Sequence, residues 1–177
     1  MRVYEGSPRQ DWEEVLRCVG TFADREHLKE ILFLELEGGF LMQGLGLPAG
    51  AMDSDSFGAL AKRTYELNDD QVSQLMDEGE ARRGSAESDR PLPGMANYYE
   101  LSLRILGNYI DQQRAHDVFF FEQDGSYVVR LFGTAGSHGA GHHLAEFTRD
   151  EMLAMIDAGP DQRGQSAPES GAGQQGG

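Results

Sequence analysis

The chain has 177 residues, with 15 basic and 30 acidic side chains and a formal net charge of −15. No basic cluster is longer than the Arg82-Arg83 pair, which argues against a nucleic acid partner, because binding phosphates needs several clustered lysines or arginines. The single cysteine, Cys18, excludes an intramolecular disulfide and a cage of thiolate metal ligands. No apolar run approaches the length of a membrane span, so we expect a cytoplasmic protein with no membrane partner.

The first half of the chain is predicted to form a helix, three strands and a second helix. A start signal at Ser7-Pro8 precedes apolar residues at helical spacing. Glycines between two β-rich runs are typical of a hairpin, because its tight turn needs positive φ. Asn68 and Gln71 have the spacing of a capping box at the start of the second helix. The predicted elements are, in chain order, a helix from Trp12 through Phe22, strands 29–36, 40–45 and 63–67, and a helix ending at Gly79.

The second half repeats this order. Residues 12–46 align without a gap on residues 99–133, an offset of 87, with nine identities in 35 pairs. Residues 65–84 align on 145–164 at an offset of 80. A repeat of about 80 residues predicts two equivalent modules, which are too small to be stable alone and should share a core. The corresponding elements are a helix from Tyr99 to Ile110, strands 117–122, 127–132 and 143–147, and a helix that follows the Thr148 capping box and ends at Gly159.

These elements predict an α+β fold. We expect a tandem duplication of a helix, three-stranded antiparallel meander, helix module with pseudo-twofold symmetry. Gly20 and Gly107 lie inside the first helix of each module, and we expect each to mark a close approach of helix to sheet. The expected boundaries are a first module at 1–84, an exposed linker at 85–96, a second module at 97–163 and a disordered tail at 164–177.

The first strand of each module is apolar at every central position. Residues 31–34 read Ile-Leu-Phe-Leu, and residues 118–121 read Val-Phe-Phe-Phe. A strand with one face in water would alternate, so both faces should be covered. The amphipathic helices can cover one face, and the sister module, another subunit or a protein partner would cover the other. The sequence therefore predicts a pseudo-dimer or a homodimer, with an interaction surface that contains Leu32, Leu34, Phe119 and Phe121.

Two glutamates interrupt the apolar face of these strands. Glu35 and Glu122 occupy equivalent positions on the face that also carries Phe33 or Phe120. A half-buried carboxylate needs a partner, and the equivalent arginines Arg17 and Arg104 are the natural candidates. We interpret these residues as two symmetry-related structural salt bridges, with a functional acid pair as the alternative.

A glycine-rich loop at 133–143 gathers three of the five histidines, His138, His142 and His143. Imidazoles at this density can bind zinc, nickel or copper. A solvated loop is the simpler interpretation, because no carboxylate nearby has the orientation to complete a site. The loop matches neither a Walker nor a dinucleotide fingerprint, and no Gly-x-Ser-x-Gly motif marks a serine nucleophile.

The order of elements and the low isoelectric point of about 4.6 resemble those of small acidic secretion-chaperone-like and YbjN-like proteins. The resemblance concerns the fold alone, and the duplicated ending departs from their order. We expect a non-enzymatic cytosolic adaptor or chaperone-like protein that binds a protein partner or itself. The alternative is a metal- or small-ligand-binding protein that uses the histidine loop, and an enzyme ranks third. No cofactor is indicated beyond a divalent metal at that loop.

Overall fold

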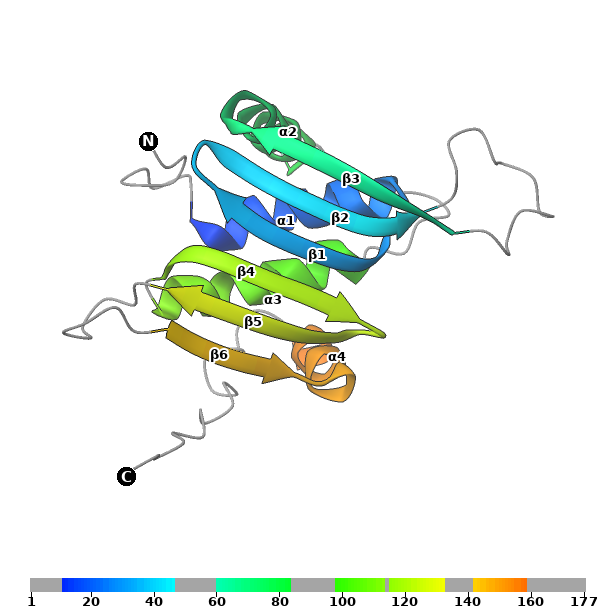
Figure 1. Ribbon diagram of the computed structural model, residues 1–177, viewed down its shortest axis with the longest axis vertical. Coiled ribbons are helices and arrows are strands. Elements are labelled where there is room, and N and C mark those ends of the chain that lie inside the picture. Colours follow the sequence, from blue (N-terminus) through cyan, green and yellow to red (C-terminus); the bar gives the residue numbers. More distant parts are fainter. Residues whose placement is uncertain (1–10, 47–59, 84–97, 114, 133–141, 159–177) are drawn as a thin grey trace.

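The computed structural model describes residues 11–46, 60–83, 98–113, 115–132 and 142–158. Its elements follow the predicted order of helix, three strands and helix, once on each side of residues 84–97 (Figure 1). This confirms the α+β class. The elements are α1 (Trp12–Arg25), β1 (Lys29–Leu36), β2 (Gly39–Gly46), β3 (Ala61–Asn68), α2 (Asp69–Arg83), α3 (Tyr98–Gln113), β4 (His116–Gln123), β5 (Ser126–Phe132), β6 (His142–Phe147) and α4 (Arg149–Ala158).

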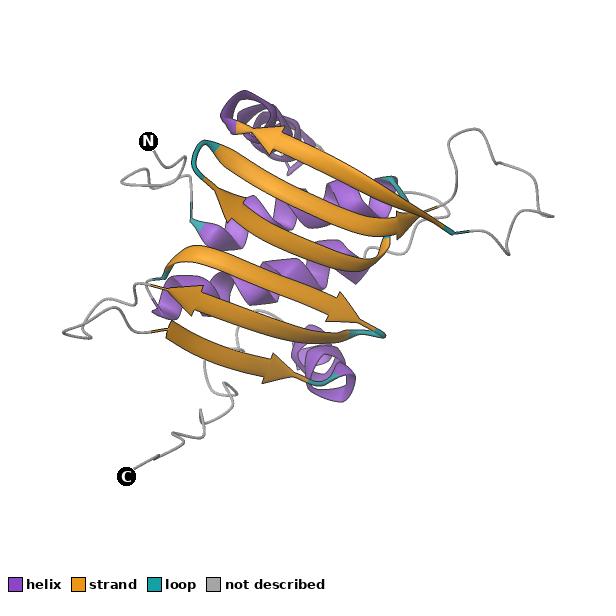
Figure 2. Cartoon of the chain, viewed as in Figure 1, coloured by secondary structure: helices purple, strands orange, loops and turns teal. Residues whose placement is uncertain are grey.

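The six strands form one antiparallel sheet in the order β3-β2-β1-β4-β5-β6. Strands β1, β2 and β3 form the predicted meander, and β1 pairs with β4 at the centre of the sheet. The four helices lie on the same side of this sheet, with α1 and α3 behind its middle strands (Figure 2). The other side carries no helix from the ranges that the structure describes.

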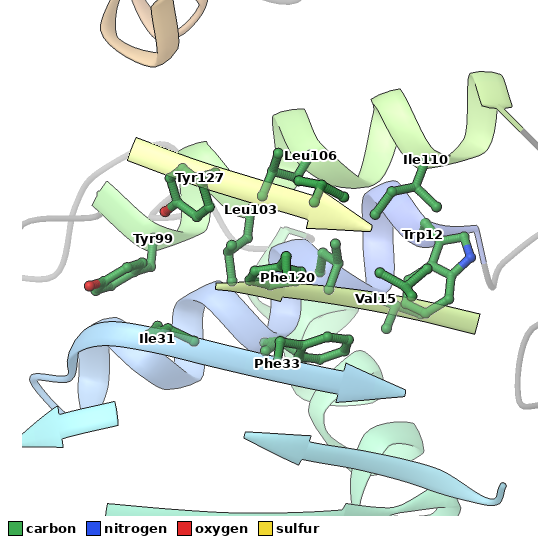
Figure 3. Close-up of a cluster of buried hydrophobic side chains, with 14 of the residues drawn as sticks. Trp12, Val15, Ile31, Phe33, Tyr99, Leu103, Leu106, Ile110, Phe120 and Tyr127 are labelled. Atoms are coloured by element: carbon green, nitrogen blue, oxygen red, sulfur yellow. The ribbon is translucent and has the colours of Figure 1, made fainter. Parts of the chain in front are cut away.

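One hydrophobic core fills the space between the sheet and the helices (Figure 3). Phe33 of β1 lies opposite Phe120 of β4, and their rings stack with centroids 4.8 Å apart. The indole of Trp12 in α1 meets Phe33 edge on, with ring centroids 6.4 Å apart. From α3, Leu103 and Leu106 are fully buried in the same core. Both halves of the chain therefore contribute to one core.

The backbones of α1 and α3 approach each other closely at two glycines, Gly20 and Gly107. A Cβ added to Gly20 would lie 2.3 Å from the carbonyl oxygen of Tyr99, and one added to Gly107 would lie 2.3 Å from that of Trp12. Such distances leave no room for a side chain, so both positions require glycine. We predicted that each glycine marks a close approach of its helix to the sheet. That prediction was wrong, because each glycine lies against the first turn of the other helix.

Each of these helices also caps the other. The carboxylate of Asp24, near the end of α1, accepts hydrogen bonds of 3.0 and 2.9 Å from two amides in the first turn of α3. The carboxylate of Asp111, near the end of α3, accepts two bonds of 2.9 Å from amides in the first turn of α1. First-turn amides have no partner inside their own helix and favour a negative charge. The two caps therefore fix how α1 and α3 lie against each other.

The Asp24 cap should make stability depend on pH. Burial raises the pKa of Asp24 from 3.8 to about 6, against the opposing effect of its amide hydrogen bonds. Between these values the folded chain binds more protons at Asp24 than the unfolded chain, so the contribution of this group falls as pH rises. The free energy of unfolding, measured in urea relative to that of an Asp24→Asn variant, should fall from pH 3.8 to about pH 6 and level off above it. A relative stability that rises across this interval would contradict the raised pKa.

Both predicted capping boxes are present. Asn68 and Gln71 exchange two hydrogen bonds of 3.0 Å at the start of α2. Before α4, the Thr148 amide donates to Glu151 at 2.7 Å, and the Glu151 amide donates back to the threonine hydroxyl at 3.3 Å. Each box supplies the partners that first-turn amides lack.

In the described part of the chain, no helix combines the length and the hydrophobicity that crossing a bilayer would require.

Candidate functional site

Alternate side chains of the sheet point away from the helices, onto the side that we call the open face. It carries all four residues predicted to form an interaction surface, Leu32 and Leu34 on β1 and Phe119 and Phe121 on β4. The register places Leu32 opposite Phe121 and Leu34 opposite Phe119. The first three named are half-buried, and Phe121 is 37% exposed. The structure thus gathers the four at the centre of the open face, and their role in binding stays a prediction.

Apolar side chains on the two neighbouring strands extend this group. Leu41 on β2 lies opposite Leu34, and Val128 on β5 lies opposite Phe121. A solvent-facing side of an antiparallel sheet is normally polar, so the fold alone does not account for these residues. We call the six residues together the apolar patch: Leu32, Leu34, Leu41, Phe119, Phe121 and Val128.

Sequence reasoning missed Leu41 and Val128, although a signal for them was present. The two residues are aligned with each other at the offset of 87, and each alternates with buried residues on its strand. The sequence did not indicate that β1 pairs with β4. Only that pairing places the two hairpins side by side and makes their outer residues one surface.

The charged side chains around the apolar patch are mixed in sign. The strand register puts Lys29, Lys62 and Arg130 on the open face, together with Glu66 and Glu146. The Arg130 guanidinium lies 4.8 Å from the centre of an exposed phenylalanine ring at the end of β5. On the other side of the sheet, α2 alone carries five acidic residues. The open face therefore does not share the acidic excess of the whole chain.

The predicted salt bridges have other partners in the structure. Arg17 Nε binds the carboxylate of Glu100 at 3.1 Å, and Arg104 Nε binds that of Glu13 at 2.8 Å. Both pairs join α1 to α3, so the prediction that these arginines bind strand glutamates was wrong. The sequence alignment did not indicate that each arginine reaches across to the other helix.

Glu122, one of the two strand glutamates, is only 6% exposed and accepts three hydrogen bonds. The Tyr99 hydroxyl donates at 2.8 Å, the Ile31 amide at 3.3 Å and the Gly125 amide at 2.6 Å. Burial raises the pKa of Tyr99, and the nearby Glu122 carboxylate raises it further, so the hydroxyl keeps its proton and remains a donor. A buried carboxylate is tolerated when donors satisfy it in this way.

Glu35, the other strand glutamate, has a similar contact on the opposite strand. Its carboxylate accepts a hydrogen bond of 2.8 Å from the Val118 amide. Val118 and Ile31 both lie at an irregularity in strand pairing, next to Asp117 and Glu30, whose φ angles are 69° and 53°. Each glutamate thus binds an amide beside the irregularity of the other central strand. These contacts favour a structural role for both carboxylates.

The structure describes only part of the predicted histidine site. His138 lies outside the described residues. The backbone of His142 is described as the first residue of β6, but its side chain is not. His143 is half-buried on the helix side of β6, and its Nε2 atom lies 2.6 Å from the Tyr109 hydroxyl oxygen. Among the residues described, no three His, Cys, Asp or Glu side chains form a group that could hold a metal ion. Metal binding by the loop stays a prediction.

Comparisons of the chain with known protein families, curated proteins and solved structures found no match. The functional argument therefore rests on the open face, where an apolar surface and a balanced set of charges occur together. Both features come from the register of the strands.

Proposed function

We propose that this chain is a non-enzymatic cytosolic protein that binds a protein through the open face of its sheet, as an adaptor or a chaperone-like protein. The observation that carries the proposal is the apolar patch at the centre of that face. Its members come from four adjacent strands, so the surface is continuous across the junction of the two halves.

The size and shape of the surface favour a protein ligand. Small molecules usually bind in concave pockets that enclose most of their surface, whereas the open face is one side of a sheet. Burying a leucine or phenylalanine side chain completely is worth about 1.5–3 kcal/mol. Five of the six patch residues are half-buried and Phe121 is 37% exposed, so each contributes part of that value when a partner covers it. Six such residues still provide the apolar centre that a protein interface requires.

Photo-crosslinking tests this proposal. A photoreactive amino acid at position 121 of the full chain should form covalent adducts with protein in cells that express it, because the Phe121 side chain lies in the apolar patch. Position 153 is the matched control. Leu153 is 40% exposed, close to the 37% of Phe121, but it lies on α4 in the helix layer. Equal adducts from the two positions would contradict the proposal.

We also propose that the chain arose by tandem duplication and that a pseudo-twofold axis passes through the Phe33–Phe120 pair. What supports this is the recurrence of contacts at the offset of 87 found in the sequence. Exchanging the two halves turns the Arg17–Glu100 pair into the Arg104–Glu13 pair. The glycine contacts and the aspartate caps between α1 and α3 exchange in the same way.

A further inference from the structure

We infer that the occupant of the open face is a second copy of this chain, so that two sheets pack face to face in a homodimer. This inference rests on the proposed function and names the partner. Three features support it: the distribution of charge, the area of the face, and the character of the sheet edges.

Charge makes the open face the natural meeting point of two copies. Each chain has a net charge of −15, so two copies repel wherever their acidic helix layers face each other. Among the described residues, the positions that the strand register places on the open face instead carry three basic residues, Lys29, Lys62 and Arg130, and two acidic ones, Glu66 and Glu146. Two such faces meet without net negative repulsion, and basic and acidic groups at the rim of one copy have opposite charges available on the other.

The area of the face fits a whole sheet better than a short peptide. Strands about 4.8 Å apart with about 3.4 Å per residue give six strands a projected area of roughly 500 Å² over about six residues. Side-chain relief makes the accessible area larger, which approaches the roughly 800 Å² per partner of a standard interface. A single added strand or helix would cover only part of the apolar patch, whereas a second sheet covers all of it.

The edges of the sheet are poorly suited to self-association. The edge strand β3 presents Lys62 and Glu66 on the open face, and the edge strand β6 presents Glu146. Charged residues on edge strands discourage edge-to-edge pairing. A face-to-face contact also closes around a twofold axis, which stops assembly at two chains. Packing through the open face therefore explains why both sides of the central strands are apolar.

Sedimentation equilibrium of the purified full chain tests the inference. We expect a mass of twice 19.5 kDa at micromolar concentration. Phe121→Asp should weaken the dimer at least about tenfold, because it places a carboxylate in the apolar centre of the interface. Leu153→Asp, the control in the helix layer, should leave the association constant unchanged. Circular dichroism checks that both variants are folded, and if Phe121→Asp does not fold, crosslinking within purified protein from a photoreactive residue at position 121 replaces it.

The outcomes separate this inference from the proposed function. A monomer at all concentrations overturns the inference, and so does a dimer that Phe121→Asp leaves intact or that crosslinks from position 153 alone. If a monomeric chain still crosslinks to a different protein from position 121 in cells, the proposed function holds and only the second copy is wrong. If position 121 crosslinks to no protein at all, both fail.

Discussion

Replacing Gly107 with alanine is expected to lower the free energy of unfolding by about 3 kcal/mol or more, since overpacking against rigid backbone lies at the upper end of small-to-large substitutions. The added methyl group would lie 2.3 Å from the carbonyl oxygen of Trp12 and 2.5 Å from the Cα of Glu13. Both atoms are backbone, so no side-chain rotation relieves the contact, and α1 must move away from α3. Urea unfolding followed by circular dichroism measures the loss.

Gly20→Ala should have an effect of similar size, because its contact with the Tyr99 carbonyl is equally short. Ser73→Ala on the exposed side of α2 is the control, with an expected change within about 0.5 kcal/mol. If both glycine variants lost less than about 1 kcal/mol of unfolding free energy, the two helix backbones would not be in close contact at these positions. Unequal losses would argue against the proposed equivalence of the two halves.

The second large effect is expected from Glu122→Ala, which should cost about 3–5 kcal/mol, because each buried donor left without its acceptor costs about 1–3 kcal/mol. The substitution removes the acceptor of three hydrogen bonds in a site that is 6% exposed. The Tyr99 hydroxyl and the Ile31 amide would then be buried without their partner, and unsatisfied buried donors carry the full cost of desolvation. Thermal and urea unfolding of the same variant measure the loss.

Glu35→Ala is the matched comparison on the other central strand. Glu35 is half-buried and accepts a hydrogen bond from the Val118 amide, so water can replace part of what the variant loses. Its cost should be smaller than that of Glu122→Ala by about 1 kcal/mol or more. The cost of Glu122→Gln should lie between the costs of Glu35→Ala and Glu122→Ala, because a carboxamide accepts through only one oxygen. Equal costs for the two alanine variants would show that the buried network around Glu122 adds nothing.

The sequence predicted those parts of the fold that depend on nearby residues. Helix starts at Asn68 and Thr148 followed from capping boxes, since both partners of each box lie within one turn. Strands were indicated by apolar runs and glycine-centred turns, and Gly38 and Gly125 have the expected positive φ of 87° and 83°. The class of fold followed from the order of these elements.

The contacts between the two halves were not predictable in the same way. Nothing in the composition of β1 indicates that it pairs with β4, so the extension of the patch to Leu41 and Val128 was missed. The arginines were assigned to the wrong carboxylates for the same reason, because Arg17 reaches Glu100, 83 positions away. Long-range partners depend on how the elements pack, and periodicity within one element does not contain that information. The histidine loop was noted from its composition, and most of it lies outside the described residues.

The claim that the open face is the contact surface is tested most directly by comparing crosslinks from positions 121 and 153 in the same cells. We predict that position 121 yields protein adducts several times more often than position 153, and that the main adduct has the mass of two chains. A main adduct with another protein would replace the second copy as occupant and leave the open face as the contact surface. Adducts that come mainly from position 153, or equally from both positions, would contradict the assignment of this face.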